Sequence, residues 1–236
     1  MVLYSPGRTS SYPEEPPATG LRFHYLGGGD EVGNVGIILE DSEGTRLLLD
    51  YGIAPTSPPR YPSEAPLVHD AVITHSHIDH LGMAPWLCAH HRTRLHGTVV
   101  TAELSDMMWR DCYKVSSIER YPLAWDKRDI DTALDSWYVH DFGVPWNHHR
   151  WELTLHPAGH IPGAAMLHIK TPETTVLLTG TSTPETHHWF EVHNPLRQIF
   201  CLLKERTEGE IIRRKKKKLT ASPLPWKRWS NAAERC

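Results

Sequence analysis

Short runs in which apolar and polar residues alternate, or in which apolar residues dominate, predict most of the β-strands of this chain. Such runs occupy residues 21–26, 35–40, 45–49, 98–101, 151–156, 164–170 and 175–179. The sequence Asp41-Ser42-Glu43-Gly44 is typical of a turn and joins the second run to the third. The glycines at 27–33 do not satisfy GxGxxG and precede a strand, so they predict a tight hairpin rather than a dinucleotide-binding loop.

Three longer segments have helical periodicity, at 81–91, 103–115 and 129–137. In the first of them Leu81, Ala84 and Leu87 fall on one face. Strands and helices follow one another in mixed order rather than as strict βαβ repeats. We therefore predict an α+β fold in which helices cover the outer faces of sheets.

Composition narrows the class of protein only a little. A chain of 236 residues holds one large domain or two small ones, 39% of its residues are hydrophobic, and its formal net charge of −3 is not that of a basic protein. No apolar run approaches the ~20 residues of a membrane span. Residues 1–20 are rich in Ser, Pro and Gly, so we expect a disordered tail and no signal peptide. The four cysteines form no CxxC pair, which fits a reducing cytoplasm.

The most informative stretch is His75-Ser76-His77-Ile78-Asp79-His80, which follows the apolar run 71–73. Imidazole nitrogens and carboxylate oxygens are ligands that zinc prefers. In an extended turn His75 and His77 point the same way and can bind one ion, which leaves Asp79 and His80 for a second ion nearby. A polar loop that happens to be rich in histidine is the alternative.

This motif, with Leu48-Leu49-Asp50-Tyr51-Gly52 before it, resembles the metallo-β-lactamase fold. Two further segments, Gly29-Asp30-Glu31-Val32-Gly33-Asn34 and Pro157-Ala158-Gly159-His160-Ile161-Pro162-Gly163-Ala164-Ala165, resemble motifs of the β-CASP nucleases, a group that processes RNA 3′ ends. The resemblance covers about residues 21–180. It implies an αββα sandwich of which this chain holds only the N-terminal portion.

The resemblance also implies a set of site residues. The first zinc ion would be bound by His75, His77 and His160, and the second by Asp79, which is also the catalytic residue, and His80. Asp50 would lie behind the ligands and orient a ligand histidine, although a plain turn residue is equally compatible with its position. Family members act on RNA with two zinc ions; the resemblance implies no membrane association and leaves a homodimer open.

The chain departs from the family at Thr181, where the fourth motif has the aspartate that bridges the two metals. Read one nucleotide earlier, the codons for residues 181–192 can encode Asp-Phe-Asp-Thr-Arg-Asp-Thr-Pro-Leu-Val-Arg-Gly, and those for 204–210 can encode Glu-Gly-Thr-Tyr-Gly-Gly-Arg. Both resemble β-CASP sequence. We therefore infer a frameshift near Gly180, an aberrant, disordered tail at 181–236, one zinc ion at most and little catalysis. The basic run 213–218 is then an accident of translation.

Two other functions stay open from the sequence. One is a hydrolase of the same fold that acts on a thioester or lactone, and the other is a non-catalytic module that binds RNA or a partner through its basic tail. The adjacent histidine pairs at 90–91, 148–149 and 187–188 are predicted to be solvated. His156 and His168 either line the cleft or face water.

Overall fold

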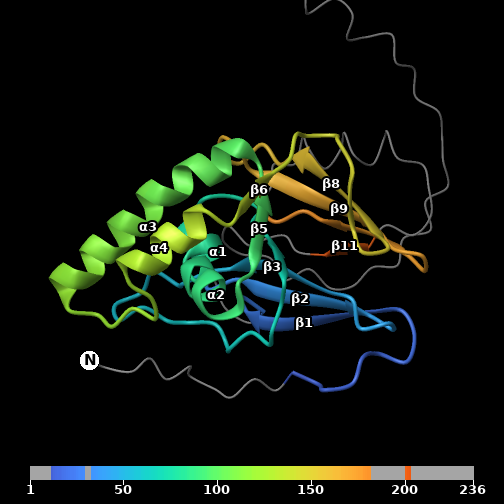
Figure 1. Ribbon diagram of the computed structural model, residues 1–236, viewed down its shortest axis with the longest axis horizontal. Helices are drawn as coiled ribbons and strands as arrows, with labels where there is room; N and C mark the ends of the chain where they lie inside the picture. The colour runs from blue at the N-terminus through green and yellow to red at the C-terminus, as the bar shows by residue number, and fades with distance from the viewer. Residues whose placement is uncertain (1–11, 30–32, 182–199, 203–236) are drawn as a thin grey trace, which may run out of the picture. The chain divides into compact units, whose positions relative to one another are not determined.

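The computed structural model describes residues 12–29, 33–181 and 200–202 of the chain (Figure 1). The predicted N-terminal tail up to residue 11, the central part of the opening hairpin, and most of the predicted aberrant tail lie outside these residues. So do the histidine pair at 187–188 and the basic run at 213–218. Residues 12–20 form neither helix nor strand, and Tyr12 donates a hydrogen bond to Glu40 at 2.7 Å.

The first sheet has six strands in sequence order. They are β1 (Leu21–Gly27), β2 (Gly36–Asp41), β3 (Arg46–Tyr51), β4 (Asp70–Val72), β5 (Arg94–Gly97) and β6 (Trp137–Val139). The first three pair antiparallel, as the turn-separated runs predicted, and β3 to β6 pair in parallel. Parallel strands end at the same edge of a sheet, so the segments that follow β3 and β4 are brought together.

The second sheet has five strands in the order β11-β10-β9-β8-β7. They are β7 (Trp146–His148), β8 (Trp151–Pro157), β9 (Ala165–Lys170), β10 (Thr175–Leu178) and β11 (Phe200–Leu202). Strands β7 to β10 pair antiparallel, whereas β10 and β11 pair in parallel. The predicted strands at 151–156, 164–170 and 175–179 are confirmed to within one residue at most ends.

Within the described part of the chain, four helices accompany the first sheet: α1 (Ile78–Leu81), α2 (Ala84–His91), α3 (Val99–Glu119) and α4 (Lys127–Leu134). The strand predicted at 98–101 is wrong. Strand β5 ends at Gly97, just before this segment. Thr98 instead caps α3 by accepting a hydrogen bond from the backbone N–H of Thr101 at 3.2 Å. The helix predicted at 129–137 ends earlier because Trp137 begins β6. None of the described helices combines the length and apolar character that crossing a membrane requires.

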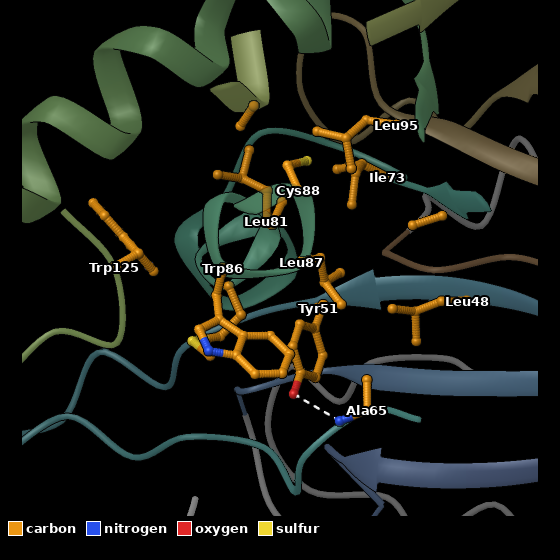
Figure 2. Packing of buried hydrophobic residues seen from close by; sticks show 14 of the residues in the cluster. Leu48, Tyr51, Ala65, Ile73, Leu81, Trp86, Leu87, Cys88, Leu95 and Trp125 are labelled. Atoms are coloured by element: carbon orange, nitrogen blue, oxygen red, sulfur yellow. Dashed lines mark hydrogen bonds between the residues drawn. The ribbon is translucent and has the colours of Figure 1, made fainter. Parts of the chain in front are cut away.

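Alternation along β3 divides the apolar residues between two cores. Leu47 and Leu49 face the second sheet, where Leu153, Leu167 and Val176 belong to the same buried cluster. Leu48 points to the opposite side, toward a cluster that contains Leu81, Trp86, Leu87 and Trp125 from the helices and the loop before α4 (Figure 2). The described residues thus form three layers of the predicted αββα sandwich: helices, first sheet and second sheet.

Candidate metal centre

The histidine motif lies at the edge of the first sheet where β3 and β4 end. His75 and His77 occupy the loop after β4, and α1 begins directly afterwards, which places Asp79 and His80 in its single turn. The backbone of this turn is held by N–H groups of neighbouring loops: Val35 N–H donates to the carbonyl of Asp79 at 2.9 Å, and Ile53 N–H to that of Ile78 at 2.9 Å. The motif is therefore anchored on both sides.

Three imidazoles converge at this edge. Nε2 of His75 lies 3.1 Å from Nδ1 of His77, and Nε2 of His160 lies 3.3 Å from that same Nδ1 atom. Two nitrogens bound to one tetrahedral zinc ion at ~2.05 Å are separated by about 3.3 Å. Since one ligand atom from each ring lies within 4.8 Å of the others, the three side chains fit a shared zinc ion.

Burial keeps His75 in the form that binds metals. Its side chain is buried, and burial together with the neighbouring His80, His77 and His160 holds the pKa of His75 well below its ordinary value. The ring is consequently neutral at physiological pH, and a neutral imidazole offers a lone pair to a metal. His77 and His160 are more exposed, so the centre opens to solvent on their side.

His160 reaches the centre from the second sheet, 83 residues after His77. Its loop connects β8 to β9 and is fixed at two points: Ala165 N–H donates to the carbonyl of Thr74 at 2.9 Å, and the hydroxyl of Thr98 donates to the carbonyl of Gly163 at 2.8 Å. Gly163 has φ +82°, and a Cβ there would lie 2.8 Å from Cβ of Val100. Glycine thus allows the loop to lie against the start of α3 and to present His160.

Asp50 and His80 form a buried pair beside the three imidazoles. Oδ2 of Asp50 lies 2.7 Å from Nδ1 of His80, and the carboxylate also accepts from the backbone N–H and the hydroxyl of Thr74, at 2.7 and 2.8 Å. Nε2 of His80 lies on the other side of the ring, 3.8 Å from Oδ2 of Asp79. The two residues predicted for a second ion therefore lie together, and Asp50 contacts one of them.

Position 181 corresponds to the bridging aspartate of the family and directly follows Gly180. Gly180 lies against the side chain of Thr74, the residue before His75. A Cβ at Gly180 would be 3.6 Å from the Cγ2 and Oγ1 atoms of Thr74. Within the part of the chain that the structure describes, Asp79 and His80 have no third His, Cys, Asp or Glu that completes a group of ligands. The centre therefore brings together a group of three imidazoles that could hold one ion, with Asp79 and His80 as a separate pair.

One prediction about histidines is wrong. His148 was expected to be solvated, but it is buried, and its Nε2–H donates to the carbonyl of Arg46 at 2.9 Å. The reason is tertiary: the end of β7 packs against β3 of the other sheet, a contact between residues 102 positions apart. His149 and His90 are exposed, as predicted, and His91 is half-buried.

Comparison with known proteins agrees with these motifs. Residues 28–192 match the family model described as the metallo-beta-lactamase superfamily. Over 160 residues the chain is 30% identical to RNase aCSPSF2 of Saccharolobus solfataricus, a match that covers 66% of this chain and 32% of that protein. It is 28% identical over 203 residues to cleavage and polyadenylation specificity factor subunit 3 of Dictyostelium discoideum, covering 80% of this chain and 26% of that protein.

A third relative, endoribonuclease YSH1 of Kluyveromyces lactis, is 29% identical over 214 residues, which cover 83% of this chain and 28% of that protein. The chain thus spans about a third or less of the length of the curated relatives it matches. The family match extends over most of the residues that build the two sheets and includes all of the clustered histidines. The chain belongs to the metallo-β-lactamase superfamily, and within it resembles the β-CASP RNA nucleases.

Proposed function

We propose that this chain is the metal-binding part of a zinc-dependent nuclease that hydrolyses RNA phosphodiester bonds. The observation that carries the proposal is the convergence of His75, His77 and His160 at the spacing of ligands to one zinc ion. The relatives named as ribonucleases and as cleavage and polyadenylation factors support RNA as the substrate.

Each residue has a role that follows from its contacts. His75, His77 and His160 would hold the first zinc ion, and Asp79 and His80 would contribute to a second. Bound zinc activates water and neutralises charge that develops on phosphoryl oxygens. Asp50 accepts from Nδ1–H of His80, which leaves the lone pair of that ring on Nε2, toward Asp79. Asp50 is therefore a positioning residue.

As translated, the chain is expected to bind one zinc ion at this centre and to have little activity. The second ion keeps only Asp79 and His80, because a threonine hydroxyl at position 181 is a poor zinc ligand. A frameshift near Gly180 would account for this loss, since codons of the neighbouring reading frame can encode an aspartate at that position. The basic tail then has no selected role in substrate binding.

The proposal is tested with two proteins. One is the chain as it stands, and the other is expressed from a gene in which the reading frame is restored downstream of Gly180. We expect the restored protein to cleave a 5′-labelled single-stranded RNA in the presence of zinc, and chelation or His77→Ala to abolish the cleavage. His90→Ala, a change of an exposed histidine outside the centre, is the matched control and should leave the cleavage rate unchanged.

Small thioesters and lactones are assayed in parallel, because the alternative function is the hydrolysis of such compounds. A restored protein that binds zinc and hydrolyses these esters but leaves RNA and single-stranded DNA intact would overturn the nuclease proposal. Absence of zinc binding at the histidine centre in both proteins would overturn the metal site itself.

A further inference from the structure

A second group of metal-binding side chains lies at the opposite end of strand β4 from His75. Asp70 is the first residue of β4, His148 is the last residue of β7, and His149 follows it. One ligand atom from each of the three lies within 4.8 Å of the others. They line a cavity of about 140 Å³, which is larger than the ~30 Å³ that one water molecule occupies in the liquid.

The hydrogen bonds of His148 define where its lone pair points. Its Nε2 atom lies 2.9 Å from the carbonyl oxygen of Arg46, and a carbonyl only accepts, so Nε2 carries the hydrogen. In a neutral ring the lone pair is then on Nδ1, which lies 3.4 Å from Oδ2 of Asp70. Two electron-rich atoms therefore face each other in a buried place. Oδ2 already accepts from Nη2 of Arg94 at 2.8 Å, and a positive species between Oδ2 and Nδ1 would relieve the repulsion that remains.

The distance between Nδ1 of His148 and Oδ2 of Asp70 distinguishes a shared proton from a metal ion. A proton shared between imidazolium and carboxylate gives a charge-assisted hydrogen bond of about 2.7–2.9 Å. Two ligands of one tetrahedral zinc ion are about 3.3 Å apart at ~2.05 Å bonds. The observed 3.4 Å is the ligand spacing, and it matches the 3.1 and 3.3 Å separations in the centre around His77.

The carboxylate of Asp70 is held in place by its other neighbours. Oδ1 of Asp70 lies 2.8 Å from Nε2 of His96 and 2.7 Å from Nε of Arg94, and Nδ1 of His96 lies 2.9 Å from Nε2 of His140. Oδ2 of Asp70 accepts a further hydrogen bond from Nη2 of Arg94 at 2.8 Å, so this guanidinium holds both oxygens of the carboxylate. The carboxylate is thus ionised and oriented, as metal-binding carboxylates are.

The positive charge of Arg94 opposes a cation at this place and lowers the affinity that two imidazoles and a carboxylate would otherwise give. The guanidinium is half-exposed, with 51% of its side-chain surface accessible, so solvent screens much of this repulsion. We therefore expect weaker binding here than at the centre formed by His75, His77 and His160.

We propose that Asp70, His148 and His149 bind a transition-metal ion of the zinc class, at a site separate from the centre at His75. Asp70 belongs to the first sheet, and the two histidines belong to the end of β7 in the second. The ion would join the two sheets at this edge. Zinc should therefore stabilise the fold even when the first centre cannot bind it.

The test measures zinc binding by the full-length chain after removal of any histidine tag. His77→Ala weakens the first centre, and two further variants are built on it: His77→Ala/His149→Ala, and the control His77→Ala/His69→Ala, which removes an exposed histidine next to Asp70. Zinc stoichiometry by calorimetry and elemental analysis, visible absorption with cobalt(II), and the thermal midpoint with and without zinc are the readouts.

We expect the His77→Ala chain and the His69 control to keep one equivalent of zinc and a zinc-dependent rise of the thermal midpoint. His149→Ala should weaken that binding by at least about 10-fold and abolish the rise. If His77→Ala fails to fold, as circular dichroism would show, the comparison is made in the unchanged chain, which should bind two equivalents against one for His149→Ala alone. Binding that is absent in His77→Ala, or unchanged by His149→Ala, overturns the proposal.

Discussion

Nδ1 of His80 lies 2.7 Å from Oδ2 of Asp50, and both side chains are almost fully buried, although 30 residues separate them in the chain. Asp50 has a left-handed backbone, with φ 53°, which turns the end of β3 toward the loop that carries His75. Its carboxylate also accepts both hydrogen bonds from Thr74. One acid therefore connects the ends of β3 and β4 and orients the ring of His80.

Asp50→Asn should destabilise the chain. Asparagine has nearly the same size and tolerates the left-handed backbone, but its amide offers a single accepting oxygen where the carboxylate offers two. At least one donor among His80 and Thr74 would be left buried without an acceptor, which costs about 1–3 kcal/mol. Urea unfolding in the presence of a chelator measures the change. Asp111→Asn, on the exposed side of α3, should cost less than about 0.5 kcal/mol; equal effects of the two substitutions would contradict the assigned role.

Gly52→Ala should disrupt the centre sterically. A Cβ at Gly52 would lie 1.6 Å from the carbonyl oxygen of Asp79, so the segment carrying Asp79 and His80 would have to move. We expect a loss of stability above the ~1–3 kcal/mol of ordinary overpacking, together with weaker zinc binding. Gly29→Ala is the matched control, since its Cβ would meet Tyr25 at an ordinary 3.5 Å. Unfolding curves and zinc titrations of the two variants should differ clearly, and similar behaviour would count against the close approach.

Thr181→Asp should add a zinc ion. The substitution places a carboxylate directly after Gly180, and this carboxylate would be a third ligand for an ion held by Asp79 and His80, which form no group of three ligands among the described residues. We expect one more equivalent of bound zinc than in the unchanged chain, measured by calorimetry and elemental analysis. Thr181→Asn, of similar shape but without charge, should leave the stoichiometry as it is. A variant with aspartate that binds no additional zinc would show that position 181 lies too far from the pair.

Stability should fall on acidification because of His168. Burial, followed by the nearby His156 and Lys170, lowers the pKa of His168 to about 4 from an ordinary value of 6.5. A histidine with a depressed pKa in the folded state stabilises the protein above pH 6.5, and this contribution disappears as the pH falls from 6.5 to 4, because the unfolded chain binds the proton first. The slope is at most about 1.4 kcal/mol per pH unit for one such group.

His168→Gln should therefore flatten the dependence of the unfolding free energy on pH between 6.5 and 4. Chemical unfolding in a chelator, which removes the pH dependence of metal binding, measures it. His69→Gln, a change of an exposed histidine, should leave the slope as in the unchanged chain. An identical slope in all three proteins would show that His168 takes up no proton on unfolding in this range.

The sequence by itself determined the parts of the molecule whose pattern is local. The strands at 21–26 and 151–156 are predicted because apolar and polar residues alternate along them, and those at 35–40 and 45–49 because apolar residues dominate a short run; both patterns are visible in neighbouring residues. The same holds for the histidine motif, which lies within six consecutive residues and includes His75, His77, Asp79 and His80. The short parallel strands β4, β5 and β6 have only three or four residues each, too few to show a period.

Only the tertiary structure decided which distant residues share a site. His160 meets His77 because the two sheets pack face to face, and Asp50 meets His80 because β3 and β4 are parallel neighbours that end at the same edge. The same packing buried His148 beside Asp70, where the polar sequence around it indicated a solvated residue. Burial and ligand geometry depend on contacts between segments far apart in the chain, and local periodicity carries no information about those contacts.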